Sequence, residues 1–95
     1  MFEVVFSKKA NETFDFIEAQ LLERWGTDTV IKFERRVLRV IEIITESPLI
    51  YQSLEMNTEV RKAVIHKNCS LFYKINEQKI VILFFWDNRQ DPIFL

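Results

Sequence analysis

The feature that most constrains the fold is an apolar run close to the end of the sequence. Residues 80–86 are all aliphatic or aromatic, and a polar cluster begins at Asp87. A run this short cannot span a membrane, which takes about 18 apolar residues. A strand that is apolar on both faces is typical of the middle of a covered sheet. The run therefore predicts a central strand with one neighbouring strand on each side.

Two segments before this run alternate between apolar and polar side chains and predict further strands. They are residues 59–66 and residues 69–75, and residues 76–79 form a tight connection to the central strand. Side chains in a strand point to opposite faces in turn. In the first segment this sets Lys62, Val64 and His66 on one face, and Arg61, Ala63 and Ile65 on the other.

Residues 1–7 also predict a short strand, with Phe2, Val4 and Phe6 on one face. This strand has no partner nearby in the sequence, and the central strand needs a second neighbour. We therefore expect residues 1–7 to lie beside residues 80–86 or at an edge of the sheet.

The segment between the first strand and the later ones predicts two helices. Ser7 can cap the first helix, and Gly26, the only glycine, is suited to end it. Thr27 or Asp28 is expected to cap the second helix, which should end at Ser47 because the next residue is proline. The two helices predict a hairpin with a turn of about two or three residues. The apolar stripes are Ala10, Phe14, Ile17 and Leu21 in the first helix, and Val30, Phe33, Val37, Val40, Ile41 and Ile44 in the second.

The resulting order β-α-α-β-β-β predicts an α+β fold in one domain of 95 residues. The helical hairpin is expected to pack on a small, mainly antiparallel sheet. The sequence shows no repeat, no linker and no low-complexity segment that would divide residues 1–95.

Composition excludes several classes of protein. The single cysteine, Cys69, rules out an internal disulfide and a cysteine-based zinc site, and it fits a reducing cytoplasm. No signal peptide or membrane-spanning run is expected. With one histidine and no glycine-rich phosphate loop, we expect no metal and no organic cofactor.

The charges are distributed unevenly along the chain. Residues 1–59 carry 7 Lys and Arg against 11 Asp and Glu, a balance of -4, whereas residues 60–95 carry 6 against 3, a balance of +3, and the two add to the net charge of -1. An acidic first half and a basic second half suggest two surfaces with different partners, although charges this sparse also serve solubility.

The order of elements, together with several short pieces of sequence, resembles the RelE/ParE superfamily, the small toxins of bacterial type II toxin–antitoxin pairs. The pieces are the proline after the second helix, the arginine early in the second strand, "FYKINEQKIVILFF" and "NRQDP". The resemblance covers essentially the whole chain and is most specific over residues 60–92. It implies a cytoplasmic toxin that inhibits growth and is neutralised by a cognate antitoxin.

The superfamily contains two kinds of toxin. RelE-like members resemble one another in being ribosome-dependent mRNA endonucleases, whereas ParE-like members poison DNA gyrase. Aligned with the nucleases, Ser70 stands where they carry an arginine, and Ala63, or Lys62 with a shift of one residue, stands where they carry a lysine. Arg89 matches the arginine at the end of the last strand, and only Phe94 remains of the segment that usually supplies an aromatic hydroxyl or base.

The physical requirements of RNA cleavage support the ParE-like interpretation. Cleavage needs a general base, a general acid and cations that hold the developing charge. The only candidates are Lys62, His66 and Arg89, and a sequence pI near 5.8 is low for a protein that binds ribosomal RNA. We therefore expect a gyrase-binding toxin without chemistry of its own. A ribosome-dependent mRNA endonuclease is the first alternative, and an inactive member that only binds its antitoxin is the second. The residues expected to bind the target are Arg61, Lys62, Trp86 and Arg89.

The expected antitoxin is a segment that folds on contact with the helical hairpin and the edge of the sheet. Because the first half of the chain is acidic, the segment should carry Lys or Arg beside apolar anchors, with main-chain pairing along an exposed strand. The two proteins are then expected to form a hetero-oligomer.

Overall fold

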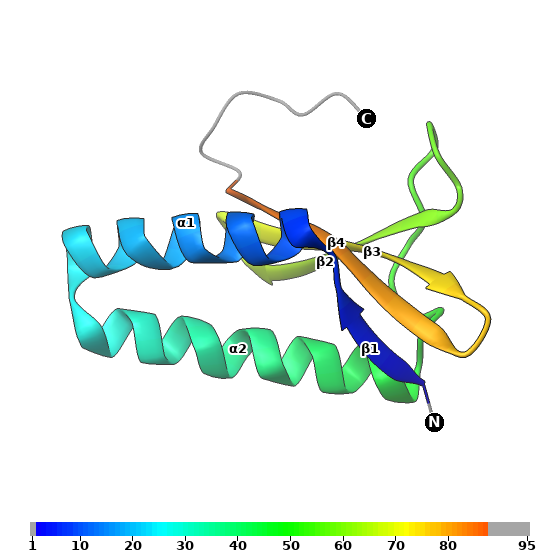
Figure 1. Cartoon of the computed structure of the whole chain (residues 1–95), viewed down its shortest axis with the longest axis horizontal. Helices are drawn as coiled ribbons and strands as arrows, with labels where there is room; N and C mark the ends of the chain where they lie inside the picture. Colours follow the sequence, from blue (N-terminus) through cyan, green and yellow to red (C-terminus); the bar gives the residue numbers. More distant parts are fainter. Residues whose placement is uncertain (1, 88–95) are drawn as a thin grey trace.

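The computed structural model describes residues 2–87, and it confirms the predicted order of elements and the α+β class (Figure 1). The predicted Arg89 and Phe94 lie outside the described residues. None of the helices in the described part is long and apolar enough to cross a membrane. The elements are β1 (Glu3–Phe6), α1 (Lys8–Trp25), α2 (Thr27–Glu46), β2 (Val60–His66), β3 (Cys69–Asn76) and β4 (Lys79–Asp87).

The four strands form one sheet in the order β1-β4-β3-β2. The apolar run of β4 therefore lies between two strands, as predicted, and β1 is its second neighbour through the parallel pairs Val4–Ile80 and Phe6–Ile82. The other two pairings, β2 with β3 and β3 with β4, are antiparallel. The prediction of a mainly antiparallel sheet is confirmed.

The short strand β1 covers only the first part of the β4 edge, and the start of α1 covers the next part. The hydroxyl of Ser7 donates to the carbonyl of Leu83 at 2.7 Å. Six residues later, the hydroxyl of Thr13 accepts a hydrogen bond from the backbone N–H of Phe85 at 2.9 Å. These bonds satisfy backbone groups that β1 leaves unpaired, and they fix α1 alongside β4.

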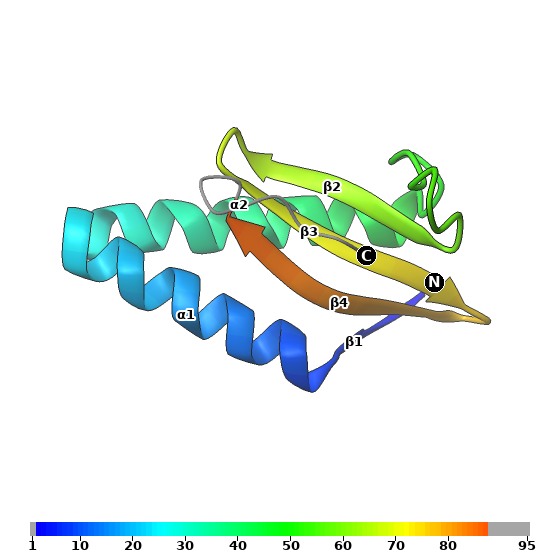
Figure 2. The ribbon, with the colours of Figure 1, turned by 90° about the horizontal axis from the view of Figure 1, so that it is seen from above.

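The helical hairpin covers one face of the sheet, which we call the inner face. Figure 2 shows α2 behind β2 and β3, and α1 running beside β4. The Phe14 ring joins the three elements, because it lies 5.5 Å from the ring of Phe33 in α2 and 5.3 Å from that of Phe85 in β4. The residues buried in this core include Ala10, Ile17, Phe33, Val37, Val40, Ile44, Ala63, Ile65, Leu71, Tyr73, Ile80, Ile82 and Phe85.

The turn of the hairpin is shorter than the sequence predicts. Ser7 caps α1 as expected, by accepting a hydrogen bond from the N–H of Ala10. Gly26 both ends α1 and precedes α2, with φ at 88°, so the turn consists of this one residue. The expectation that Thr27 or Asp28 caps α2 is wrong, because both already lie in its first turn. A glycine tolerates the positive φ that so sharp a reversal requires.

The loop of residues 47–59 is fastened to the sheet at several points. The Tyr73 hydroxyl donates to the carbonyl of Pro48, and the Arg61 guanidinium donates to the carbonyl of Tyr51, both at 2.6 Å. Two backbone bonds, Leu54 N–H to Val60 and Lys62 N–H to Gln52, join the loop to the outer edge of β2. The loop thereby covers the first half of that edge.

Two irregularities in the strand pairing decide which side chains share a face. In β4, Leu83 is an extra residue, because Phe72 pairs with Phe84 and Tyr73 with Ile82. In β2, the residue between Val64 and His66 is extra in the same way, because Val64 pairs with Ser70 and His66 with Cys69. A bulge of this kind reverses the alternation of faces for every residue that follows it.

Candidate functional site

The face of the sheet turned away from the helical hairpin, which we call the outer face, is built from rows of side chains across three strands. The register sets Val64, Ser70 and Trp86 in one row. The next row holds Lys62, Phe72 and Phe84, and the third holds Val60, Lys74 and Val81.

The floor of the outer face is apolar and aromatic. The rings of Phe72 and Phe84 stack with their centroids 4.7 Å apart, and Val60 completes this cluster. Trp86 and Leu54 of the fastened loop pack against it. Aromatic side chains in such a floor supply a large, rigid contact area at low entropic cost.

Lysines surround this floor. The ammonium group of Lys9, in the first turn of α1, lies 5.6 Å from the centre of the Phe84 ring. Lys62 is exposed and Lys74 is partly exposed on the neighbouring strands. An apolar floor with cations around it can bind a protein surface that combines apolar and acidic groups, or the bases and phosphates of a nucleic acid.

The structure separates the residues that the sequence predicts as target-binding. Lys62 and Trp86 both lie on the outer face, two rows of one surface. Arg61 points to the inner face, where its row partner is Tyr73 and its guanidinium holds the carbonyl of Tyr51. Lys62 and Trp86 are therefore brought together, and Arg61 is not part of their surface.

The prediction that Lys62, Val64 and His66 share one face of the sheet is wrong for His66. The bulge in β2 places His66 in a row with Cys69 and Asp87, on the inner side of the sheet. There the Nδ1 of His66 accepts a hydrogen bond of 3.4 Å from the N–H of Asn68. Lys62 and His66, the described members of the nuclease set, thus point to opposite sides of the sheet.

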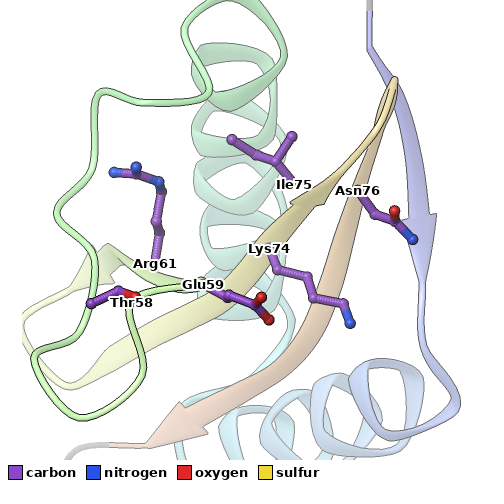
Figure 3. Close-up of a pocket in the computed structure, with 6 residues that line it drawn as sticks. All are labelled: Thr58, Glu59, Arg61, Lys74, Ile75 and Asn76. Carbon is purple, nitrogen blue, oxygen red and sulfur yellow. The ribbon is translucent and has the colours of Figure 1, made fainter.

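A hollow of about 370 Å³ lies at the start of β2 and the end of β3, and Figure 3 shows its lining. Arg61 and Lys74 are its two cations, and Figure 3 shows their side chains extending in different directions. The two charges therefore do not converge on a single ligand. The remaining lining residues are Thr58, Glu59, Ile75 and Asn76.

A second cavity, of about 400 Å³, lies where the closed end of the helical hairpin extends past the sheet; we call it the hairpin cleft. Sequence reasoning did not single out two residues at this site, namely Lys32 and Arg36. The i,i+4 spacing of Lys32 and Arg36 beside the buried Phe33 is a signal that points to one shared helix face. The full lining is Ile17, Leu21, Trp25, Thr29, Lys32, Phe33, Arg36, Ile65, His66, Asn68, Cys69 and Asp87.

The environments of Glu18 and Tyr73 shift the pKa values of these two side chains. The hydrogen bond that Glu18 of α1 makes to Glu34 of α2, together with burial and the negative charges of Glu34 and Asp15, raises the pKa of Glu18 to about 7. Two carboxyl groups can share a hydrogen bond only when one is protonated, which favours the uncharged form. Burial raises the pKa of the Tyr73 hydroxyl to about 12. That hydroxyl therefore remains a hydrogen-bond donor to Pro48 at neutral pH.

No group of three or more His, Cys, Asp or Glu side chains within residues 2–87 could hold a metal ion. The outer face of the described sheet also carries neither a histidine nor a carboxylate in its three rows. The described residues of the outer face therefore form an apolar, aromatic floor with lysines around it.

Comparison with known proteins gives a family and a fold. The family model described as "ParE toxin of type II toxin-antitoxin system, parDE" matches residues 4–92. No curated protein gives a significant sequence match. Among solved structures, the chromosomal ParDE TA system from P. aeruginosa is similar with a TM-score of 0.78 and 15% identity, over 92% of this chain and 96% of that chain.

Two further structures show the same fold at low identity. The YoeB dimer from Staphylococcus aureus has a TM-score of 0.68 and 15% identity, over 90% of this chain and 94% of that chain. The E. coli DinJ-YafQ complex has a TM-score of 0.63 and 11% identity, over 94% and 96%. The similar structures therefore include toxins named as ParE and toxins named as YoeB and YafQ.

Proposed function

Because the chain belongs to the ParE toxin family of type II toxin–antitoxin systems, we propose that it inhibits growth by binding DNA gyrase. The outer face of the sheet makes this contact, and a cognate antitoxin neutralises the toxin. The observation that carries the proposal is the bulge in β2, which turns His66 away from Lys62 and leaves the outer face as an aromatic floor surrounded by lysines. Such a surface is suited to binding rather than to proton transfer.

The fastened loop supports a protein target. Leu49, Ile50 and Met56 are each more than 60% exposed, whereas the loop that carries them is held to Tyr73, Arg61 and the β2 edge. Apolar side chains presented on a fixed backbone lose little entropy when a partner covers them. A folded protein target such as gyrase can therefore bind these exposed apolar side chains better than an RNA strand can.

The alternative of a ribosome-dependent mRNA endonuclease rests on the same outer face. Lys9, Lys62 and Lys74 around stacked aromatic rings would also suit phosphates and unstacked bases. The structures named YoeB and YafQ share the fold. The third alternative, a member that only binds its antitoxin, requires neither target.

The antitoxin is proposed to use the helical hairpin and the edge of the sheet. The loop of residues 47–59 pairs with the first half of β2, so main-chain pairing is left to the second half of that edge. The structures of the YoeB-YefM and DinJ-YafQ complexes are named as toxin–antitoxin pairs, which supports a hetero-oligomer here.

The test compares growth arrest, gyrase supercoiling and cleavage of translated mRNA for the wild type and three variants. Trp86→Ala should weaken gyrase inhibition about 10-fold or more, because buried aromatic side chains carry much of an interface's energy. Arg89→Ala should also weaken it, whereas His66→Ala should leave it unchanged. Lys79→Ala, an exposed lysine at the far end of β4, is the control for lost charge.

The outcome that overturns the proposal is equally specific. In that outcome the wild type does not inhibit supercoiling by gyrase but cleaves translated mRNA on the ribosome, and His66→Ala lowers the cleavage rate about 100-fold. This result would identify a nuclease that uses a general acid or base. If cells continue to grow when the wild type or any variant is expressed, and the antitoxin still binds, the protein is an inactive family member that only binds its antitoxin.

A further inference from the structure

The hairpin cleft lies on the opposite side of the sheet from the proposed target surface. Its walls are the last turns of α1, the first turns of α2 and the connection between β2 and β3. The one-residue turn at Gly26 holds the two helices together where they extend past the sheet (Figure 1). The cleft is therefore bounded by regular elements on most sides.

The inside of the cleft is apolar. Ile17, Phe33 and Ile65 are buried, and Leu21 is half-buried beside them. Trp25 forms one wall and is 65% exposed, a high value for so large a side chain. A cavity of about 400 Å³ accommodates one or two apolar side chains and is near the lower end of the range for ligand pockets.

Two exposed cations line the cleft. Lys32 and Arg36 lie one helical turn apart on α2, and both are exposed. Within residues 2–87 neither side chain has a hydrogen bond or an ion pair. The carboxylate of Asp87 also lines the cleft, but it is only 5% exposed and already interacts with the surrounding protein. Among the described lining residues, the accessible charge is therefore positive.

We propose that the hairpin cleft is the docking site for an acidic, apolar segment of the cognate antitoxin. An apolar side chain of the segment enters between Trp25 and Phe33, and a neighbouring Asp or Glu lies between Lys32 and Arg36. His66 lines the same cleft, so its role is to contact the bound segment. The inference rests on the proposed function, because the occupant is the protein that neutralises the toxin.

The shape of the site favours a segment that folds on binding over the surface of a folded enzyme. An extended or helical segment can place a single side chain in a small, partly open cleft, whereas a folded surface is flatter. The positive charge of the cleft also contrasts with the pair of carboxyl groups, Glu18 and Glu34, that are hydrogen-bonded to each other between the two helices. The antitoxin should therefore carry acidic residues for the cleft in addition to the basic residues expected for the acidic half of the toxin.

The test measures the affinity of the toxin for the purified product of the adjacent gene. The double variant Lys32→Glu/Arg36→Glu should bind about 100-fold more weakly, since both cations then repel the acidic segment. Trp25→Ala should bind about 10-fold more weakly. The matched control for the single variant Lys32→Glu is Lys79→Glu, which makes the same change in net charge at an exposed position outside the helical hairpin and away from the cleft, and should bind as the wild type does.

A charge exchange provides the second measurement. Replacing the acidic residues of the antitoxin one at a time with Lys should identify a variant that binds Lys32→Glu/Arg36→Glu better than the unaltered antitoxin does. Circular dichroism confirms that each toxin variant is folded, which is expected because the altered side chains are exposed.

The outcomes separate this inference from the proposed function. If the antitoxin binds the cleft variants and the wild type equally well, the cleft assignment is overturned and the toxin–antitoxin pairing stands. If gyrase inhibition is lost in the cleft variants while antitoxin binding is kept, the cleft belongs to the target instead. If the wild type does not bind the product of the adjacent gene, both the pairing and the cleft assignment fail.

Discussion

The inner and outer faces of the sheet are both lined by apolar residues, but the helices cover only the inner one. On the inner face, Leu71, Tyr73 and Ile82 are completely buried under the hairpin. On the outer face, Phe72 and Phe84 are buried in a cluster against which Leu54 of the loop also packs, whereas Val64 in the next row is 55% exposed. Apolar character on the inner face therefore contributes mainly to stability, and on the outer face it also supplies the surface that we propose binds the target.

The same contrast applies to the positive charges of the second half of the chain. Arg61 and Lys62 are consecutive, yet Arg61 fastens the loop on the inner face and Lys62 is exposed on the outer face. A strand turns neighbouring side chains to opposite faces, so a cluster of charges in the sequence is divided between two tasks in the structure.

The largest difference between the two faces should appear when an apolar side chain is shortened on each. Leu71→Ala on the inner face should lower the free energy of unfolding by about 2–5 kcal/mol, because it leaves a cavity in the packed core. Val64→Ala on the outer face should change it by less than about 0.5 kcal/mol. Urea denaturation of both variants measures the difference. Equal losses would mean that the outer face is as much a part of the core as the inner face.

Two buried hydroxyls, one on each face, sharpen the comparison. Tyr73→Phe removes the hydrogen bond to Pro48 and should cost about 1–2 kcal/mol, since the loop loses one of its attachments. Ser70 is fully buried on the outer face, and among the described residues its hydroxyl has no hydrogen-bond partner. Ser70→Ala should therefore be close to neutral. A large loss in Ser70→Ala would show that this hydroxyl is bonded, and would contradict the prediction.

The smallest expected effect concerns the helical layer that covers the inner face. Glu18 has a pKa of about 7 in the folded protein and an ordinary value of 4.5, so folding takes up a proton between these pH values. Stability should therefore fall as the pH rises from about 4.5 to 7, and the repulsion between Glu18 and Glu34 is fully present above pH 7.

Glu34→Gln removes that repulsion and should stabilise the protein by about 1 kcal/mol at pH 8, a value reduced for screening by solvent. The gain should vanish near pH 5, where Glu18 is protonated in the wild type. Thermal unfolding at the two pH values measures it, and Glu42→Gln, an exposed carboxylate on the same helix, is the control. A gain that is independent of pH would contradict the role of Glu18.

Much of the fold follows from local patterns in the sequence. The helical spacing of the α1 and α2 stripes, the cap at Ser7 and the break at Gly26 each act over a few residues, and the structure confirms them. The central position of β4 was also predictable, because an apolar run on both faces requires a neighbour on each side. The turn at Gly26 was predicted too long, since the sequence does not show that one glycine can end one helix and begin the next.

The candidate site was predicted only in part. Lys62 and Trp86 were identified and do share the outer face, but His66 was assigned to the wrong side of the sheet. Lys32 and Arg36 were not singled out, because their cleft joins two helices to a strand connection that lies some 30 residues further along the chain.

The sequence by itself determined the order of elements, the helical hairpin, the central strand and the family to which the chain belongs. The tertiary structure alone decided which side chains share a face after each bulge, and which residues line the hairpin cleft. The physical reason lies in the range of the interactions. Helical periodicity and caps depend on residues a few positions apart, whereas a bulge depends on how β2, β3 and β4 pair along their whole length. One extra residue in β2 was enough to move His66 from the surface of Lys62 to the cleft beside α2.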